Sequence, residues 1–165
     1  MGLILDFSVL ITAERQGQNS RQMLTAISAV VGDTEIAMSV ITLIELSHGV
    51  ARADSALRKV KRSQFIQELL TAVAIHPVTT SIALRAGQID GENQAKGLRL
   101  PIADLLIGVT ALELQYSVAT ANLRHFGMVP GLKVISLYTA IEICYCAPRC
   151  RARRTARKKS PELAG

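Results

Sequence analysis

Two kinds of apolar pattern alternate along this chain: short uninterrupted apolar runs, and longer stretches in which apolar positions recur every three or four residues. The first run, from Gly2 to Asp6, ends on an acid, which indicates a buried strand whose last residue emerges at a sheet edge. Similar short runs predict further strands at 35–39, 74–76, 116–121 and 134–137.

The intervals between these strands carry the helical spacing. Helices are expected over about 8–15, 20–30, 39–50, 55–73, 80–96 and 102–115, with Ser8 and Ser20 as N-caps of the first two, and a loop over 122–126. Strands that alternate with helices from start to finish predict an α/β fold. We expect a mostly parallel central sheet of about four to five strands, flanked by helices on both faces.

Length and composition indicate how many domains the chain forms and in which environment it folds. The chain has 165 residues, 49% of them hydrophobic, which suits one domain with a core that needs no disulfides. The mean hydropathy is positive at +0.28, yet no apolar run approaches the roughly 20 residues of a membrane span. The first residues also lack the basic region of a signal peptide, so we predict a soluble, cytoplasmic protein.

A net charge of +6 would suggest a nucleic-acid partner, but the excess positive charge is confined to one end of the chain. From Arg149 onward there are seven basic residues against Glu162, and the remaining basic and acidic residues cancel. We therefore divide the chain into a neutral globular domain, 1–146, and a basic tail, 147–165, whose low hydrophobicity predicts disorder. Attraction of a polyanion would have to come from a local patch or from this tail.

The only cysteines, Cys144, Cys146 and Cys150, cluster near the tail. An odd cluster is a poor disulfide framework, and a zinc site built from these three alone lacks a fourth ligand.

Candidate chemistry gathers where the predicted strands end. Parallel sheets place ligands at the carboxyl ends of their strands; Asp6 ends one strand and Asn122 follows another. Asp104, in the first turn of a helix, and Glu45, early in another, could project over the same edge. Three adjacent carboxylates repel one another unless a cation or protons neutralise them, and an all-oxygen site favours Mg²⁺ or Mn²⁺ over zinc.

Four blocks of the chain, 5–11 (LDFSVLI), 42–46 (TLIEL), 102–107 (IADLLI) and 119–126 (ATANLRHF), resemble PIN-domain toxins of the VapC type in order and spacing. The resemblance spans roughly residues 3–137, almost the whole globular part. Four blocks in order are far more specific than any one of them.

This resemblance implies a PIN-like fold and a metal-dependent endoribonuclease, with RNA as its substrate and a cognate antitoxin as its partner. It implies catalytic, metal-binding roles for Asp6, Glu45 and Asp104, either direct or through water, and supporting roles for Ser8, Thr120 and Asn122. A homodimer or a toxin–antitoxin hetero-oligomer is implied too, with apolar helices near the amino end as the contact surface.

The chain departs from the resemblance at one point. Similar proteins often carry a fourth acid after the last catalytic strand, where this chain has the neutral Asn122 and, later, His125. Fewer negative charges imply weaker binding of a second metal ion. His125 and the adjacent Arg124 are candidates for contact with RNA.

Simpler interpretations stand beside these. Asp6 could be only a helix cap, Asp104 an ordinary acid at a helix start, and Glu45 a member of a salt bridge. His48 could contact substrate, orient Glu45, or be a plain partly buried histidine. The basic group at 58–62 could face RNA, although such a run is usually the solvated face of a helix, and the basic tail could grip RNA phosphates.

Two other functions remain open at this level. The first is an RNA-binding or scaffold module that keeps the fold without turnover, which the missing fourth acid would permit. The second is a phosphatase with an aspartyl nucleophile, which usually needs an acid two residues later, where this chain has Ser8.

Overall fold

The computed structural model describes residues 2–137 and contains a sheet of five strands in the order β3-β2-β1-β4-β5. The strands are β1 (Gly2–Leu5), β2 (Glu35–Ser39), β3 (Ala74–His76), β4 (Ser117–Ala119) and β5 (Val134–Ile135). Every pair of neighbouring strands is parallel. The predicted α/β class is confirmed, and this sheet is wholly rather than mostly parallel.

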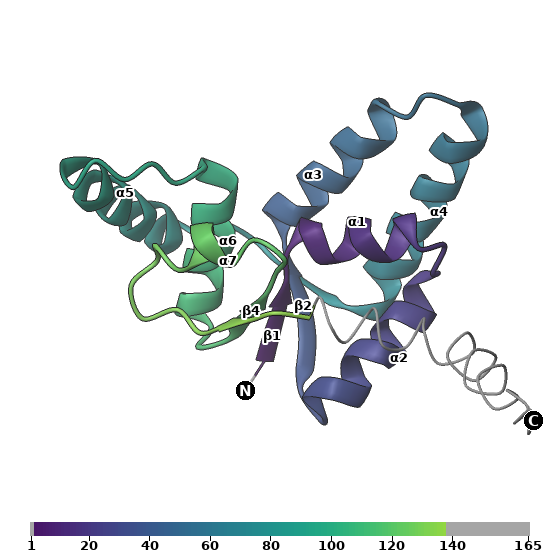
Figure 1. Cartoon of the computed structure of the whole chain (residues 1–165), viewed down its shortest axis with the longest axis horizontal. Coiled ribbons are helices and arrows are strands. Elements are labelled where there is room, and N and C mark those ends of the chain that lie inside the picture. Colours follow the sequence, from purple (N-terminus) through teal and green to yellow (C-terminus); the bar gives the residue numbers. More distant parts are fainter. Residues whose placement is uncertain (1, 138–165) are drawn as a thin grey trace, which may run out of the picture.

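Helices cover the sheet on both faces (Figure 1). They are α1 (Phe7–Arg15), α2 (Ser20–Val31), α3 (Val40–Ala51), α4 (Ala56–Ala72), α5 (Thr80–Ala95), α6 (Ile102–Glu113) and α7 (Leu123–Phe126). In Figure 1, α1, α2 and α4 lie on one side of the strands, and α5, α6 and α7 lie on the other.

The central strand β1 shows how the apolar pattern produces these layers. All its residues are buried, and successive side chains point to opposite faces. Leu3 and Leu5 pack with residues of α1, α2 and α4, whereas Ile4 packs with Ile107 and Ala111 of α6. A strand buried on both faces reads as a continuous apolar run, which is why the sequence shows no alternation here.

Three local predictions were wrong. Asp6, not Ser8, caps α1, because the Asp6 side chain accepts a hydrogen bond from the Ser8 backbone N–H. Asn19, not Ser20, caps α2 and forms a capping box with Gln22. Each helix starts one residue after its cap. The predicted loop at 122–126 contains the single-turn helix α7, which is too short for a periodic signal and is anchored by the buried Phe126.

The boundary predicted at 146/147, the basic tail and the three cysteines lie outside the described residues. Within residues 2–137, no helix is long and apolar enough to cross a membrane.

Candidate functional site

The carboxyl ends of β1 and β4 meet at the point where the chain changes direction across the sheet. From β1 the chain proceeds to β2 and β3 on one side, then crosses to β4 and β5 on the other. The Asp6 backbone N–H donates to the Ala119 carbonyl at 3.0 Å, which fixes Asp6 at this crevice. Such switch points are where open parallel sheets bind ligands.

Asp6 is held by hydroxyl groups. Its Oδ2 accepts from Ser8 Oγ at 2.6 Å and from Thr120 Oγ1 at 2.8 Å, and the side chain is 4% exposed. Those hydroxyls in turn accept backbone N–H bonds from Ala121 and Asn122, both at 2.9 Å. The amides and hydroxyls form one connected chain of hydrogen bonds that fixes the position of Asp6 Oδ2.

Glu45 reaches the same edge from α3. Thr42, one turn earlier on that helix, is fully buried, and its hydroxyl donates to the Leu5 carbonyl at 3.2 Å, which ties α3 to the end of β1. Glu45 Oε2 is buried and accepts no hydrogen bond from any described residue. Burial, followed by the charges of Asp6 and Asp104, raises the pKa of Glu45 to about 7. The alternative of a salt bridge for Glu45 finds no partner among the residues described.

Asp104 lies in the first turn of α6, where no side chain caps the helix, so its charge suits the helix dipole. Its Oδ2 accepts from Asn122 Nδ2 at 3.2 Å and lies 2.6 Å from His125 Nδ1. Burial raises the pKa of Asp104; the hydrogen bond and charge of His125 oppose this rise, and the charge of Asp6 adds to it.

The structure thus brings the three acids together: the charges of Asp6 and Asp104 add to the rise in the pKa of Glu45, and the charge of Asp6 adds to the rise in the pKa of Asp104. Within residues 2–137, however, no three metal-binding side chains already converge on a single point. An unpartnered buried carboxylate oxygen and an all-oxygen donor set fit a hard divalent cation.

The remaining candidates are placed differently. His48 is exposed on α3, so its interpretation as a partly buried histidine was wrong; Arg124 is exposed on α7. Of the basic group on α4, Arg58 pairs with Asp54, and Arg62 pairs with Glu14, whereas Lys59 and Lys61 are exposed.

Sequence reasoning missed the positioning role of Thr42. The sequence does contain a feature that indicates this role. Thr42 is a hydroxyl residue three positions before Glu45, so it lies on the same side of the helix, and the segment around it is mostly apolar.

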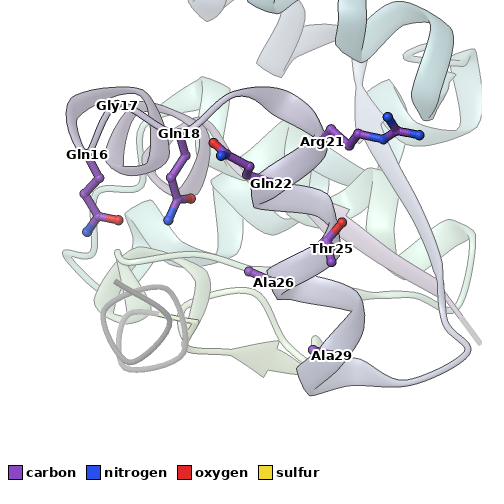
Figure 2. Close-up of a pocket in the computed structure, with 8 residues that line it drawn as sticks. All are labelled: Gln16, Gly17, Gln18, Arg21, Gln22, Thr25, Ala26 and Ala29. Atoms are coloured by element: carbon purple, nitrogen blue, oxygen red, sulfur yellow. The ribbon is translucent and has the colours of Figure 1, made fainter. Parts of the chain in front are cut away.

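A pocket of about 730 Å³ lies at the junction of α1 and α2 (Figure 2), and none of the three carboxylates is among the described residues that line it. It is lined by Gln16, Gly17, Gln18, Arg21, Gln22, Thr25, Ala26 and Ala29. The described residues of this lining include no acid or histidine, which are the groups that metal-dependent hydrolysis needs.

Comparison with known proteins agrees with this fold. The model of the PIN domain family matches residues 3–132. Ribonuclease VapC10 of Mycobacterium tuberculosis is 31% identical over 131 residues, 79% of this chain and 90% of the relative. Ribonuclease VapC1 of Rickettsia felis is 28% identical over 137 residues, 83% of this chain and 97% of the relative.

A solved structure of VapBC2 from Rickettsia felis, bound to a DNA fragment from its promoter, superposes with a TM-score of 0.70. The identity is 23%, and the match covers 82% of this chain and 98% of that one. At this identity, the likeness concerns the fold.

The five-stranded parallel sheet, covered by helices on both faces, is a PIN-like fold. This chain belongs to the PIN domain family, among proteins of the VapC type, and the resemblance read from the sequence is confirmed.

Proposed function

We propose that this protein is a divalent-metal-dependent endoribonuclease that hydrolyses RNA phosphodiester bonds as the toxin of a type II toxin–antitoxin pair. Its VapC relatives, which are named ribonucleases, support the activity. The observation that carries the proposal is Glu45: its Oε2 is buried and unpartnered among the described residues, and burial, followed by the charges of neighbouring acids, raises its pKa to about 7. Perturbed acids gathered in a crevice are typical of a functional site.

Asp6, Glu45 and Asp104 are the residues that would hold the metal, directly or through water. Their oxygen donors suit Mg²⁺ or Mn²⁺. When bound, the ion supplies a water of lowered pKa and neutralises charge that develops on the scissile phosphate.

The other residues of the site orient these acids. Ser8 and Thr120 fix Asp6, and the Asn122 amide donates to Asp104. Ligands held by hydrogen bonds need little reorganisation to bind an ion, which is why such supporting groups contribute to metal affinity. We assign Ser8, Thr120 and Asn122 this supporting role.

Two side chains on α7 are suited to contact RNA. Arg124 is exposed beside the site, so its guanidinium is available to a phosphate. His125 is partly exposed, and because its Nδ1 lies against Asp104, only its other ring nitrogen is free for RNA.

The antitoxin partner is inferred from a structurally similar complex. The Rickettsia felis structure is a VapBC2 complex, and we assign this chain a cognate antitoxin in the cytoplasm, with the toxin as a homodimer or in a hetero-oligomer. Ile44 on α3 and Leu57 and Val60 on α4 are 59%, 65% and 54% exposed, which leaves apolar surface for such an assembly.

The proposal is tested with purified protein and total RNA, in Mg²⁺, in Mn²⁺ and in EDTA, with cut ends mapped by sequencing. We expect cleavage by the wild type in the divalent ions and none in EDTA or with Asp6→Asn. Asp33→Asn is the matched control, since Asp33 is exposed in the turn between α2 and β2 and should leave cleavage unchanged.

A catalytically weak or inactive RNA-binding module is the second candidate, favoured by Asn122 and His125, which bring no additional carboxylate to Asp104. Intact RNA in both Mg²⁺ and Mn²⁺, with RNA still bound, would establish that module and exclude the nuclease.

A further inference from the structure

A second cavity lies at the junction of α1 with α4, and basic side chains outnumber acidic ones around it. Its volume is about 720 Å³, and we call it the basic pocket. None of the three carboxylates of the candidate site is among the described residues that line it. The charged side chains of its lining are Arg15, Arg58, Lys61, Arg62, Glu14 and Glu68.

Two of these cations are not neutralised by the described part of the protein. Arg62 pairs with Glu14, and Arg58 pairs with Asp54. Arg15 and Lys61 are exposed, and no carboxylate within residues 2–137 lies at ion-pair distance from either. The basic pocket therefore presents two cationic side chains, one from α1 and one from α4, to a negatively charged ligand.

The basic pocket adjoins the helices that carry two of the site's acids. Asp6 caps α1 and Arg15 is the last residue of that helix, so at 1.5 Å per residue roughly 14 Å separate the two positions. In Figure 1, α1 extends from the end of β1 towards α4. Gly49, one turn after Glu45 on α3, accepts a hydrogen bond from Arg62 in the pocket wall. A flexible strand a few nucleotides long is able to span this separation.

We propose that the basic pocket is a second contact site for RNA, in which Arg15 and Lys61 bind backbone phosphates of the strand that reaches the carboxylates. The inference rests on the proposed function, because RNA is the polyanion which that function supplies.

The distribution of charge supports this contact. Outside the basic tail, the basic and acidic residues of the chain cancel, so attraction of RNA to the domain needs a local patch. The three carboxylates do not provide it, since like charges repel phosphates until a cation binds. Lysine and arginine contacts to phosphates contribute affinity without reading sequence. The basic pocket therefore supplies affinity, while the carboxylate edge supplies the chemistry.

The structure also separates the members of the basic group on α4. Lys61 lines the basic pocket, whereas Lys59 is exposed on the same helix and is not among the described lining residues. The two lysines carry the same charge and lie two residues apart. Lys59 is therefore a matched control for the loss of charge at Lys61.

The test measures binding of a single-stranded RNA of about 12 nucleotides by fluorescence anisotropy, in EDTA and over a series of KCl concentrations. Arg15→Gln and Lys61→Gln together should weaken binding by at least about tenfold at low salt. Each substitution should also reduce the slope of log affinity against log salt by about 0.7. Lys59→Gln should change the affinity by less than about twofold and leave this slope unchanged.

A double variant that binds RNA as tightly as the wild type would overturn the inference, and so would equal losses from Lys59→Gln and Lys61→Gln. Polyglutamate that binds the wild type more tightly than RNA does would also overturn it, in favour of an acidic protein segment. RNA that stays intact in Mg²⁺ and Mn²⁺, but binds the wild type more tightly than the double variant, would contradict the nuclease and leave the basic pocket as an RNA contact. Cleavage by a wild type whose double variant binds RNA equally well would do the reverse.

Discussion

The carboxylate edge of the sheet and the junction of α1 with α4 both contain charged side chains. They differ in whether those side chains are paired with groups of opposite charge. At the junction, Arg62 pairs with Glu14 at 2.7 Å and donates to the Gly49 carbonyl at 2.7 Å. At the carboxylate edge, Glu45 Oε2 has no partner among the described residues and lies near two further acids.

This difference separates charges that hold the fold together from charges kept for chemistry. Arg62 ties α4 to α1 and to α3, and both members of its pair are about three-quarters buried. The carboxylates do not stabilise one another, since the charges of Asp6 and Asp104 raise the pKa of Glu45 and the charge of Asp6 raises that of Asp104. An arrangement that destabilises the metal-free fold indicates a role that folding alone does not explain.

Glu45→Gln should produce the largest effect. RNA cleavage should fall by roughly 10³-fold, because a metal ligand supports several kcal/mol of transition-state stabilisation. The metal-free variant should nevertheless be at least as stable as the wild type at neutral pH, since a repelling buried charge is gone. Cleavage assays and urea denaturation in EDTA measure the two effects. Full cleavage by this variant would remove Glu45 from the metal site.

Thr120→Val should have the next largest effect on activity. It removes the hydroxyl that donates to Asp6 at 2.8 Å without changing the size of this fully buried side chain. Loss of a hydrogen bond to a metal ligand typically costs about 10–100-fold in metal affinity or activity. Mn²⁺ titration and cleavage rates should fall together; unchanged Mn²⁺ affinity would show that Thr120 does not support Asp6.

Arg62→Ala tests whether the charges at the α1–α4 junction stabilise the fold without contributing to cleavage. It should destabilise the fold by about 1–3 kcal/mol, because it leaves Glu14 and the Gly49 carbonyl without their donor. Cleavage per folded molecule should not change. Arg58→Ala is the matched control: the Arg58–Asp54 pair is 62% and 66% exposed, and such pairs contribute about 0.5 kcal/mol or less. Equal effects in urea denaturation would contradict this distinction.

The final prediction concerns the pH dependence of stability. The pKa of Glu45 rises on folding from 4.5 to about 7, so between these values the native state binds more protons than the unfolded state. The free energy of unfolding of the metal-free protein should therefore fall as pH rises through this window. Glu45→Gln should remove most of the slope, and Mn²⁺ should oppose it in the wild type. A flat profile in EDTA would contradict the raised pKa.

Much of the fold was readable from short-range patterns. The runs at Gly2–Leu5 and Glu35–Ser39 and the helical spacing between them predicted parallel strands and crossover helices, because period and burial are local properties of the chain. The N-caps of α1 and α2 were misplaced, by two residues and by one, since nearby polar residues could each have capped the helix.

The sequence alone determined the layer architecture, the family resemblance and the identity of three candidate acids. Tertiary structure alone decided what surrounds each acid: Thr42 tying α3 to β1, two hydroxyls engaging one oxygen of Asp6, and His125 engaging one oxygen of Asp104. The physical reason is separation along the chain. Asp6 and Thr120, or Asp104 and His125, become neighbours only once the sheet has formed, so no local pattern records which oxygen is taken and which remains for an ion.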